Sequence, residues 1–260
     1  MNILEKIIVS KKHEIAEKSK IITIERLKDS QRLYAIRDFK KSLLNSTIDI
    51  IAEIKRKSPS MGDILPNSSP KQIAKVYATY GASAISVLTD EPFFGGKLEY
   101  ISDVKAEVKI PVLRKDFIIS EYQIWESYFS GTDAILLIAD VLEFSQMENL
   151  YELARELGLH VLLETHDLEL IPSIVKLNPE IVGINCRNLK NMKTDLNWFS
   201  QAIELLPSNS VKVAESGILK NSELQFVESL GFDAALIGTS LMKTGKPGVA
   251  LAKLIQREPK

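Results

Sequence analysis

Short apolar runs alternate with segments of helical periodicity along almost the whole chain. Eight runs rich in Val, Ile, Leu and Ala are five to seven residues long, which is typical of buried parallel strands. They span residues 49–55, 83–88, 110–114, 133–138, 159–164, 181–185, 211–215 and 234–238. Strands and helices that alternate in this way predict an α/β fold, in which a right-handed series closes into a (β/α)8 TIM barrel.

Helix signals between the runs support this alternation. The clearest is SSPKQIAKVYATYG, in which Ser69 is a candidate N-cap, Pro70 occupies the first helical position and Gly81 is a stop signal. The segments ENLYELARELG and NSELQFVESLG repeat this design. An open doubly wound sheet is the alternative, but neither GDILP nor FFGGK supplies the glycine fingerprint of a dinucleotide-binding sheet.

Two segments stand apart from the strand–helix series. Residues 1–45 precede the first strand and are predicted to form a helical extension, in which RDFKKSL is a second helical patch that could cap the barrel. Residues 56–69 form the first loop after a strand. This loop is longer than the usual connection of about 2 to 6 residues, and its length favours a role as a lid. A chain of 260 residues with 45% hydrophobic content can remain one domain, so residues 1–260 are expected to form a single barrel domain.

The charge balance and the length of the apolar runs narrow the functional classes. The chain has 33 basic and 34 acidic residues and a formal net charge of -1, so no overall field attracts nucleic acid or an anionic membrane. No apolar run approaches the roughly 20 residues that span a bilayer, and the charged amino terminus lacks the apolar core of a signal peptide. We therefore expect a soluble, cytoplasmic protein without nucleic-acid or membrane partners.

The single cysteine, Cys186, excludes an intrachain disulfide and fits a reducing compartment. Because Cys186 directly follows Asn185 in a strand, its side chain should face away from that amide, and we expect a buried structural thiol. The three histidines show no recognisable zinc spacing with this cysteine, so no metal is predicted.

Ionisable and amide side chains stand where the apolar runs end. Glu53 and Lys55 are two positions apart and therefore share one face of their strand. Further strand ends carry Lys115, Glu164, Asn185 with Arg187, and Glu215. In a (β/α)8 barrel the carboxyl ends of the strands form the active site, so two lysines and three carboxylates should share one pocket. A structural ion-pair network at the barrel mouth is the alternative, although buried ion pairs contribute little net stability.

The last two strands end in small residues, which favours an anion site. Residues 214–217 read AESG and residues 237–242 read IGTSLM, and a short helix near Thr239 would direct its positive end at an anion. Strands seven and eight carry the phosphate site of many barrel enzymes. A lysine in such a pocket can act as a general acid, and we expect burial among cations to lower its pKa. This combination suits a phosphorylated sugar derivative.

Seven motifs together resemble those of the indole-3-glycerol phosphate synthase family, in family order and over essentially the full length of the chain. They are AEIKRKSPS, SVLTDEPFFGG, PVLRKDF, LLETH, GINCRNL, AESGI and LIGTSLM. The resemblance implies conversion of 1-(2-carboxyphenylamino)-1-deoxyribulose 5-phosphate into indole-3-glycerol phosphate, with loss of carbon dioxide and water, in tryptophan biosynthesis. It also implies that no cofactor is needed. We expect a monomer or a weak homodimer.

The resemblance also implies roles for individual residues. Lys115 would be the general acid of ring closure and Glu164 the base of the dehydration, while Lys55 would steer the substrate carboxylate. Glu53 would orient the two lysines, Asn185 and Glu215 would hold substrate hydroxyls, and Arg187 lies next to this network. The phosphate-binding positions are Ser58, Ser216, Gly217, Gly238 and Thr239, and the positions around the anthranilate ring are Pro59, Phe94, Phe117, Leu136 and Leu189. Met61 replaces a lysine that is common in the first loop of the family.

Two other functions fit parts of the sequence. An isomerase of a related phosphosugar, such as phosphoribosylanthranilate isomerase, would need a paired cysteine and aspartate at other strand ends, where this chain has lysines and glutamates. A barrel that binds a phosphorylated metabolite without turnover would need the phosphate motifs alone, and it could discard Lys115 or Glu164. Both residues are present, which favours catalysis.

Overall fold

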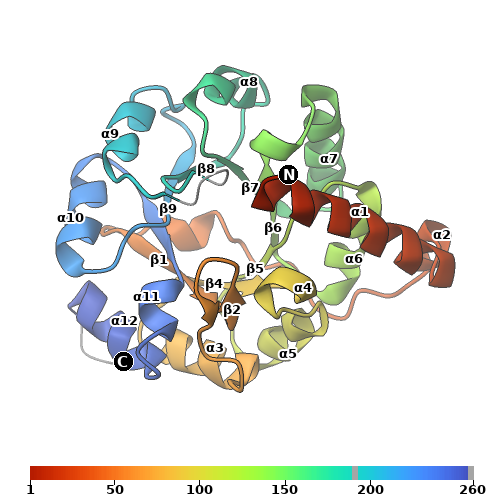
Figure 1. The fold of residues 1–260 in the computed structure, drawn as a ribbon, viewed down its shortest axis with the longest axis horizontal. Coiled ribbons are helices and arrows are strands. Elements are labelled where there is room, and N and C mark those ends of the chain that lie inside the picture. The colour runs from red at the N-terminus through yellow and green to blue at the C-terminus, as the bar shows by residue number, and fades with distance from the viewer. Residues whose placement is uncertain (189–192, 257–260) are drawn as a thin grey trace.

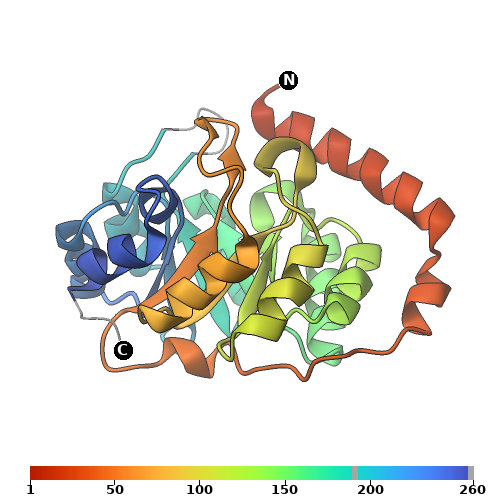
Figure 2. The same cartoon turned by 90° about the horizontal axis from the view of Figure 1, so that it is seen from below.

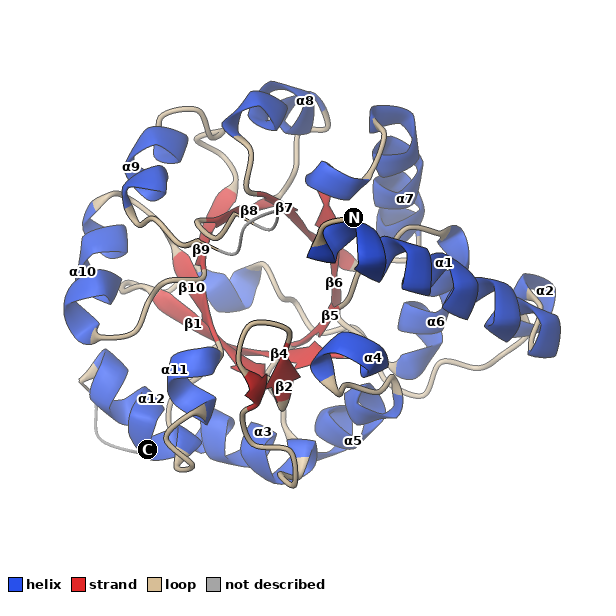
Figure 3. Ribbon diagram, viewed as in Figure 1, coloured by secondary structure: helices blue, strands red, loops and turns tan. Residues whose placement is uncertain are grey.

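Eight parallel strands close into a barrel (Figures 1 and 3) in a computed structural model that describes residues 1–188 and 193–256. Around the barrel the order is β1-β10-β9-β8-β7-β6-β5-β4. The strands are β1 (Asp49–Ile54), β4 (Ala84–Leu88), β5 (Val112–Lys115), β6 (Ala134–Ile138), β7 (His160–Thr165), β8 (Ile181–Asn185), β9 (Val211–Glu215) and β10 (Ala234–Ile237). The predicted (β/α)8 barrel is confirmed, and each predicted strand boundary lies within two residues of the observed one.

Helices surround the barrel and follow its strands in turn. They are α3 (Pro70–Thr79), α4 (Glu91–Phe94), α5 (Glu99–Glu107), α6 (Glu121–Ser130), α7 (Phe144–Glu156), α8 (Ile171–Lys176), α9 (Asn197–Ile203), α10 (Asn221–Ser229), α11 (Thr239–Met242) and α12 (Pro247–Ile255), with short 3-10 turns η2 (Ala139–Val141) and η3 (Leu168–Leu170). Helix α3 begins as predicted, because Ser69 accepts a hydrogen bond from the Gln72 amide and Pro70 opens the helix. Gly81 follows its end with a φ of +94°.

Two layers of buried side chains alternate along the strands. One set, which includes Ile50, Ala52 and Leu163, packs between the strands and the helices. The other, which includes Leu113, Leu162 and Val213, fills the barrel interior. Successive side chains of a strand point to opposite faces. The residues two positions beyond the interior set, Lys115, Glu164 and Glu215, therefore point inward at the carboxyl end, as the sequence pattern predicted.

The amino-terminal extension contacts both ends of the barrel. Helix α1 (Ile3–Ile21) begins over the rim of the barrel at the carboxyl end of the strands and runs outward past α6 (Figures 2 and 3). Its Leu4 and Ile7 join the interior cluster, and α2 (Ile24–Lys28) follows it. Residues 37–43 were predicted to be helical, but only the 3-10 turn η1 (Lys41–Leu43) forms there, with the Asp38 carboxylate accepting from the Lys41 amide. The fully buried side chains of Phe39 and Leu43 nevertheless join the interior cluster of the barrel, so this segment packs against the barrel without the predicted helix.

The first loop after a strand is long, as predicted, and contains a small hairpin. Strand β2 (Lys57–Ser58) pairs antiparallel with β3 (Gly62–Asp63), at the same end of the barrel as α1 (Figure 2). The Cys186 thiol is buried, as expected. Among the described residues, every helix is too short or too polar to cross a lipid bilayer.

Candidate active site

A cavity of about 700 Å³ opens at the carboxyl end of the barrel. Most of the predicted site residues line it, namely Glu53, Lys55, Phe94, Lys115, Phe117, Leu136, Glu164, Asn185, Arg187, Glu215, Ser216, Gly217, Gly238 and Thr239. Two do not: Ser58 is buried in the β2–β3 hairpin, where its Oγ accepts from the Met61 amide at 3.2 Å, and Pro59 is exposed at the tip. Leu189 lies outside the described residues. The catalytic and binding roles of all these residues stay predictions.

The charged side chains of the cavity form two adjoining ion-pair groups. Lys115 Nζ lies 2.5 Å from Glu164 Oε2 and 2.7 Å from Glu215 Oε2, while Lys55 Nζ lies 2.5 Å from Glu53 Oε1. Asn185 Nδ2 donates a hydrogen bond of 3.0 Å to Glu164 Oε1. The site therefore holds Lys115 between two carboxylates, one of which is itself oriented by an amide.

Two glycines make room for the carboxylates. A Cβ on Gly183 of β8 would overlap Glu215 Oε1, and a Cβ on Gly238 would overlap Glu53 Oε1. The absence of a side chain at these two positions lets each carboxylate cross the neighbouring strand. The sequence shows both glycines, but which group approaches them depends on the closed barrel.

The protonation states follow from this arrangement. Burial disfavours the charged form of Lys115, but the carboxylates of Glu164, Glu215 and Glu53 outweigh it and raise the pKa of the lysine. The sequence-based expectation of a lowered pKa is wrong because carboxylates, not cations, are the closest neighbours. Lys115 is consequently protonated at neutral pH and can serve as an acid.

The pKa values of the two carboxyl groups beside Lys115 are shifted in opposite directions. Burial opposes the ionisation of Glu164, yet Lys115 and hydrogen bonds lower its pKa. At Glu215, burial and the negative charge of Glu164 raise the pKa well above the ordinary value, although Lys115 opposes this. Glu215 therefore takes up a proton more readily than Glu164, and such a difference between neighbouring groups is suited to moving protons within a site.

Small residues at the carboxyl ends of β9 and β10 line one side of the cavity, here termed the cradle, namely Ser216, Gly217, Gly238 and Thr239. Ser216 and Gly217 both adopt left-handed backbone conformations, with φ of +70° and +73°, so the chain turns sharply there. Helix α11 begins at Thr239, as predicted. Lys243 also lines the cavity and was not predicted. Its position one helical turn after Thr239 is the signal that could have identified it.

An apolar wall faces this cradle across the cavity. The rings of Phe94 and Phe117 lie 6.1 Å apart, and Leu136 belongs to the same lining. The sequence analysis missed further apolar lining residues, Leu88, Ile138, Leu196 and Leu236. Leu88, Ile138 and Leu236 are the last inward positions of their strands, so the period-two pattern could have identified them.

The described part of the cavity holds no cluster of metal ligands. Within residues 1–188 and 193–256, no three His, Cys, Asp or Glu side chains are grouped so as to hold a metal ion. The three glutamates of the cavity instead pair with its two lysines Lys55 and Lys115.

Fold and cavity together define a (β/α)8-barrel protein whose cavity at the carboxyl ends of the strands is lined by paired lysines and glutamates, by small residues and by an apolar wall. The family model of indole-3-glycerol phosphate synthase matches residues 4–254. The chain therefore belongs to the indole-3-glycerol phosphate synthase family. This membership decides against the isomerase alternative.

Curated relatives agree with this assignment, and solved structures agree with the fold. The chain is 46% identical to the indole-3-glycerol phosphate synthase of Bacillus pumilus, over 88% of this chain and 92% of the relative. It is 41% identical to that of Bacteroides thetaiotaomicron, over 98% of both. Among solved structures it is similar to 3-hexulose-6-phosphate synthase from Salmonella typhimurium (TM-score 0.65, 12% identity, covering 80% of this chain and 97% of the other). It is also similar to N-acetylmannosamine-6-phosphate 2-epimerase from Clostridium perfringens (TM-score 0.63, 14% identity, 83% and 96%), and both likenesses show the fold alone.

Proposed function

We propose that the chain converts 1-(2-carboxyphenylamino)-1-deoxyribulose 5-phosphate into indole-3-glycerol phosphate, carbon dioxide and water in this cavity. Membership of the family makes it a carboxy-lyase of tryptophan biosynthesis. The observation that carries the proposal is the position of Lys115, held 2.5 Å from Glu164 and 2.7 Å from Glu215 in a cavity that also presents an apolar wall and the cradle. Lys115, the apolar wall and the cradle match the ketone, the anthranilate ring and the phosphate of the substrate.

Ring closure needs an acid at the substrate ketone. The ring carbon that bears the carboxylate attacks the ketone carbon, and the carbonyl oxygen gains negative charge as the new carbon–carbon bond forms. Lys115 donates a proton to that oxygen, and its positive charge stabilises the oxygen before the proton transfers. Glu164 and Glu215 keep Lys115 protonated until this step, since both lie within ion-pair distance.

Decarboxylation and dehydration follow at the same atoms. Carbon dioxide leaves, and the electron pair of its bond returns to the ring system. The new hydroxyl then departs as water after it takes up a proton, a transfer that Lys55 assists, while Glu164 removes a proton from the neighbouring carbon of the intermediate. Lys55, oriented by Glu53, steers the substrate carboxylate, and Asn185 and Glu215 hold the substrate hydroxyls, with Arg187 beside them.

The remainder of the substrate is bound by the two sides of the cavity. The phosphate binds to Ser216, Gly217, Gly238 and Thr239, assisted by Ser58, and the anthranilate ring packs against the apolar wall with Pro59 and Leu189. The β2–β3 hairpin acts as a lid that carries Ser58 and Pro59 toward the substrate. The small residues at the ends of β9 and β10 and the aromatic wall on the opposite side of the cavity support this orientation.

The proposal extends to the protein as a whole. It treats residues 1–260 as a single domain in which residues 1–45 serve as an extension of the barrel. The enzyme works in the cytoplasm on a small phosphorylated substrate, needs no metal or organic cofactor, and is a monomer or a weak homodimer.

The Lys115→Met variant tests the catalytic assignment. General acid catalysis contributes about 10²- to 10⁴-fold, so kcat, followed by indole fluorescence with EDTA present, should fall by at least about 100-fold. The dissociation constant of the substrate should change much less, because the phosphate cradle and the apolar wall remain. Lys220→Met is the matched control, since Lys220 is exposed and pairs with Glu223 at 4.0 Å. Full activity of Lys115→Met, or substrate binding without turnover by the unmodified chain, would contradict the proposal.

A further inference from the structure

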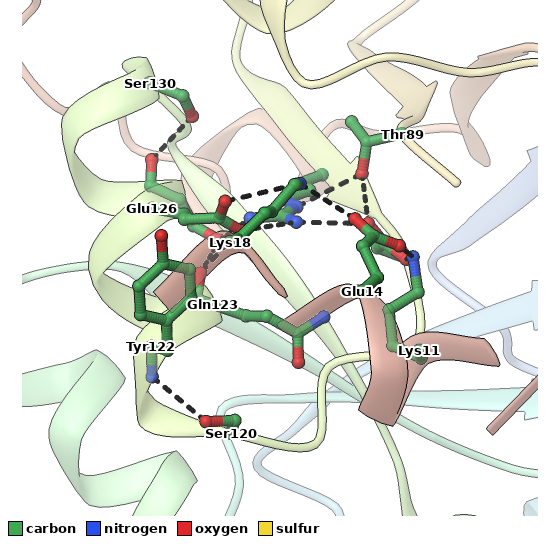
Figure 4. A network of polar contacts seen from close by, with 12 residues as sticks. Lys11, Glu14, Lys18, Thr89, Ser120, Tyr122, Gln123, Glu126 and Ser130 are labelled. Carbon is green, nitrogen blue, oxygen red and sulfur yellow. Dashed lines mark hydrogen bonds and ion pairs between the residues drawn. The ribbon is translucent and has the colours of Figure 1, made fainter. Parts of the chain in front are cut away.

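Helix α1 carries a lysine that is buried as deeply as any core residue. The side chain of Lys11 is 1% exposed, although the residues that follow it, Lys12 and His13, face solvent. A buried ammonium group is stable only where it is paired and hydrogen-bonded. Its surroundings therefore show what holds the helix on the barrel, and Figure 4 shows this network with Lys11, Glu14 and Lys18 of α1.

Lys11 joins three carboxylates from three elements. Its Nζ lies 2.7 Å from Glu14 Oε2 on the same helix, 3.1 Å from Asp90 Oδ2 after β4, and 3.0 Å from Asp116 Oδ1 after β5. Asp90 and Asp116 are each 1% exposed in their side chains. Lys11 thus cross-links two buried loops of the barrel mouth through a helix that lies outside the βα series.

The loop after β5 belongs to the proposed site. Asp116 stands between Lys115 and Phe117, and all three residues line the cavity. The second oxygen of Asp116 accepts from Thr89 Oγ1 at 2.6 Å and from Arg114 Nη2 at 3.1 Å. Asp116 is therefore fixed from the barrel side by Arg114 and from the α1 side by Lys11.

The loop after β4 carries the other aromatic ring of the wall. Asp90 is the N-cap of the four-residue helix α4, and its Oδ1 accepts from the Phe93 amide at 2.9 Å. Helix α4 ends at Phe94, whose ring lies 6.1 Å from that of Phe117. The ammonium group of Lys11 thus contacts both Asp90, which caps the helix that carries Phe94, and Asp116, which lies between Lys115 and Phe117.

We propose that Lys11 is a positioning residue for the reaction, which sets the spacing of the Phe94–Phe117 wall and the direction of Lys115. This inference rests on the proposed function, because it uses the roles given there to Lys115 and the aromatic wall. Lys11 itself touches no substrate. It acts through Asp90 and Asp116, and its distance from the reacting atoms distinguishes it from the catalytic groups.

Removal of Lys11 leaves Asp90 and Asp116 without their shared cation, so the resulting loss of activity should depend on pH. Burial raises the pKa of Asp90, the charge of Asp116 adds to this, and Lys11 opposes both. The other charged groups around the pair are Glu14 and Lys18 on α1, Arg114 on β5 and Glu126 on α6, which pairs with both Lys18 and Arg114. Without Lys11 the pKa of Asp90 rises further, so the repulsion between the two aspartates is relieved as the pH falls and grows as it rises.

The test compares Lys11→Met with Lys12→Met, its exposed neighbour on α1. Misplacement of reacting groups by about 1 Å can reduce rates about 100-fold, so kcat/KM of Lys11→Met should fall about 10- to 100-fold while Lys12→Met stays at the level of the unmodified chain. The loss should include a rise in KM, which a smaller fraction of folded enzyme would not produce. It should also shrink as the pH falls into the range in which Asp90 takes up a proton. A kcat/KM within about twofold of Lys12→Met, or a loss in kcat alone that is independent of pH, would overturn the inference.

A second variant covers the case in which Lys11→Met does not fold. The double variant Lys11→Met with Asp90→Asn removes one charge of each sign, and asparagine can still cap α4. Circular dichroism should show a folded protein, yet KM should remain raised because α1 no longer holds the two loops. A folded double variant with unchanged kinetics would overturn the inference. An inactive unmodified chain would overturn the proposed function, and this inference with it, whereas an active one with an unimpaired variant overturns the inference alone.

Discussion

A single methyl group added at Gly183 should displace a carboxylate of the site. In the Gly183→Ala variant the new Cβ would overlap Glu215 Oε1 and would lie 3.2 Å from Leu162 Cδ1. Glu215 is buried, and its other oxygen is 2.7 Å from Lys115 Nζ. The carboxylate must therefore move by about 1 Å to reach an ordinary contact distance, which separates it from Lys115.

The size of the effect follows from the packing around Gly183. Overpacking of a tight core costs about 1 to 3 kcal/mol, and the lower chain entropy of alanine in the unfolded state offsets about 0.4 to 1 kcal/mol of this. We expect a net loss of about 1 to 2 kcal/mol, or a melting temperature lower by about 2 to 8 °C for a chain of this size. Turnover should fall about 10-fold or more, because Lys115 loses one of its two partners.

A double-mutant cycle with Glu215→Asp measures the proposed contact directly. Aspartate is shorter by one methylene group, so it would leave room for the alanine methyl. The stability cost of Gly183→Ala, from urea unfolding, should be smaller by about 1 kcal/mol in the Glu215→Asp background. Additive effects within about 0.3 kcal/mol would refute the argument, since they would show that the methyl group and the carboxylate do not meet.

Three further predictions concern other residues of the barrel. Lys243→Met should raise KM for the phosphorylated substrate several-fold with little change in kcat, and the difference should shrink with added salt; a KM equal to that of the unmodified chain would argue against a role in the cradle. Burial opposes the charged form of His166, but Asp140 at 2.7 Å raises its pKa above 6.5, so this pair stabilises the fold fully below that value and less as pH rises through the folded pKa. The His166→Asn variant should accordingly lose more unfolding free energy in acid than in alkaline buffer, and the opposite order would contradict this. Burial raises the pKa of Cys186 to about 12, so the folded protein should resist iodoacetamide that labels the unfolded chain, and rapid labelling of the folded protein would disprove the thiol's protection.

The strands and the inward-facing catalytic candidates could be predicted because both depend on local patterns. Buried parallel strands appear as continuous apolar runs, and the period of two assigns Lys115, Glu164 and Glu215 to the same face as Leu113, Leu162 and Val213. Closure of the barrel then brings the strand ends together. The register agrees, because Asn185 pairs with Glu215, and Glu164 with Gly183.

The electrostatics and the extension depend on contacts that the sequence does not display. The direction of the pKa shift of Lys115 was predicted wrongly, because it depends on which charges lie closest to the lysine in space. Lys11 has charged neighbours along α1, as surface helices commonly do, and its burial results from packing against loops some 80 and 105 residues away. The segment RDFKKSL contains a helical pattern, but its buried Phe39 and Leu43 needed only one 3-10 turn to join the interior cluster of the barrel.

The most direct test of the central claim is to measure carbon dioxide and indole-3-glycerol phosphate together, as the purified chain acts on 1-(2-carboxyphenylamino)-1-deoxyribulose 5-phosphate in EDTA. The account predicts that both products appear in equal amounts and at the same steady rate, because ring closure, decarboxylation and dehydration occur in one cavity. Substrate binding without either product would contradict it.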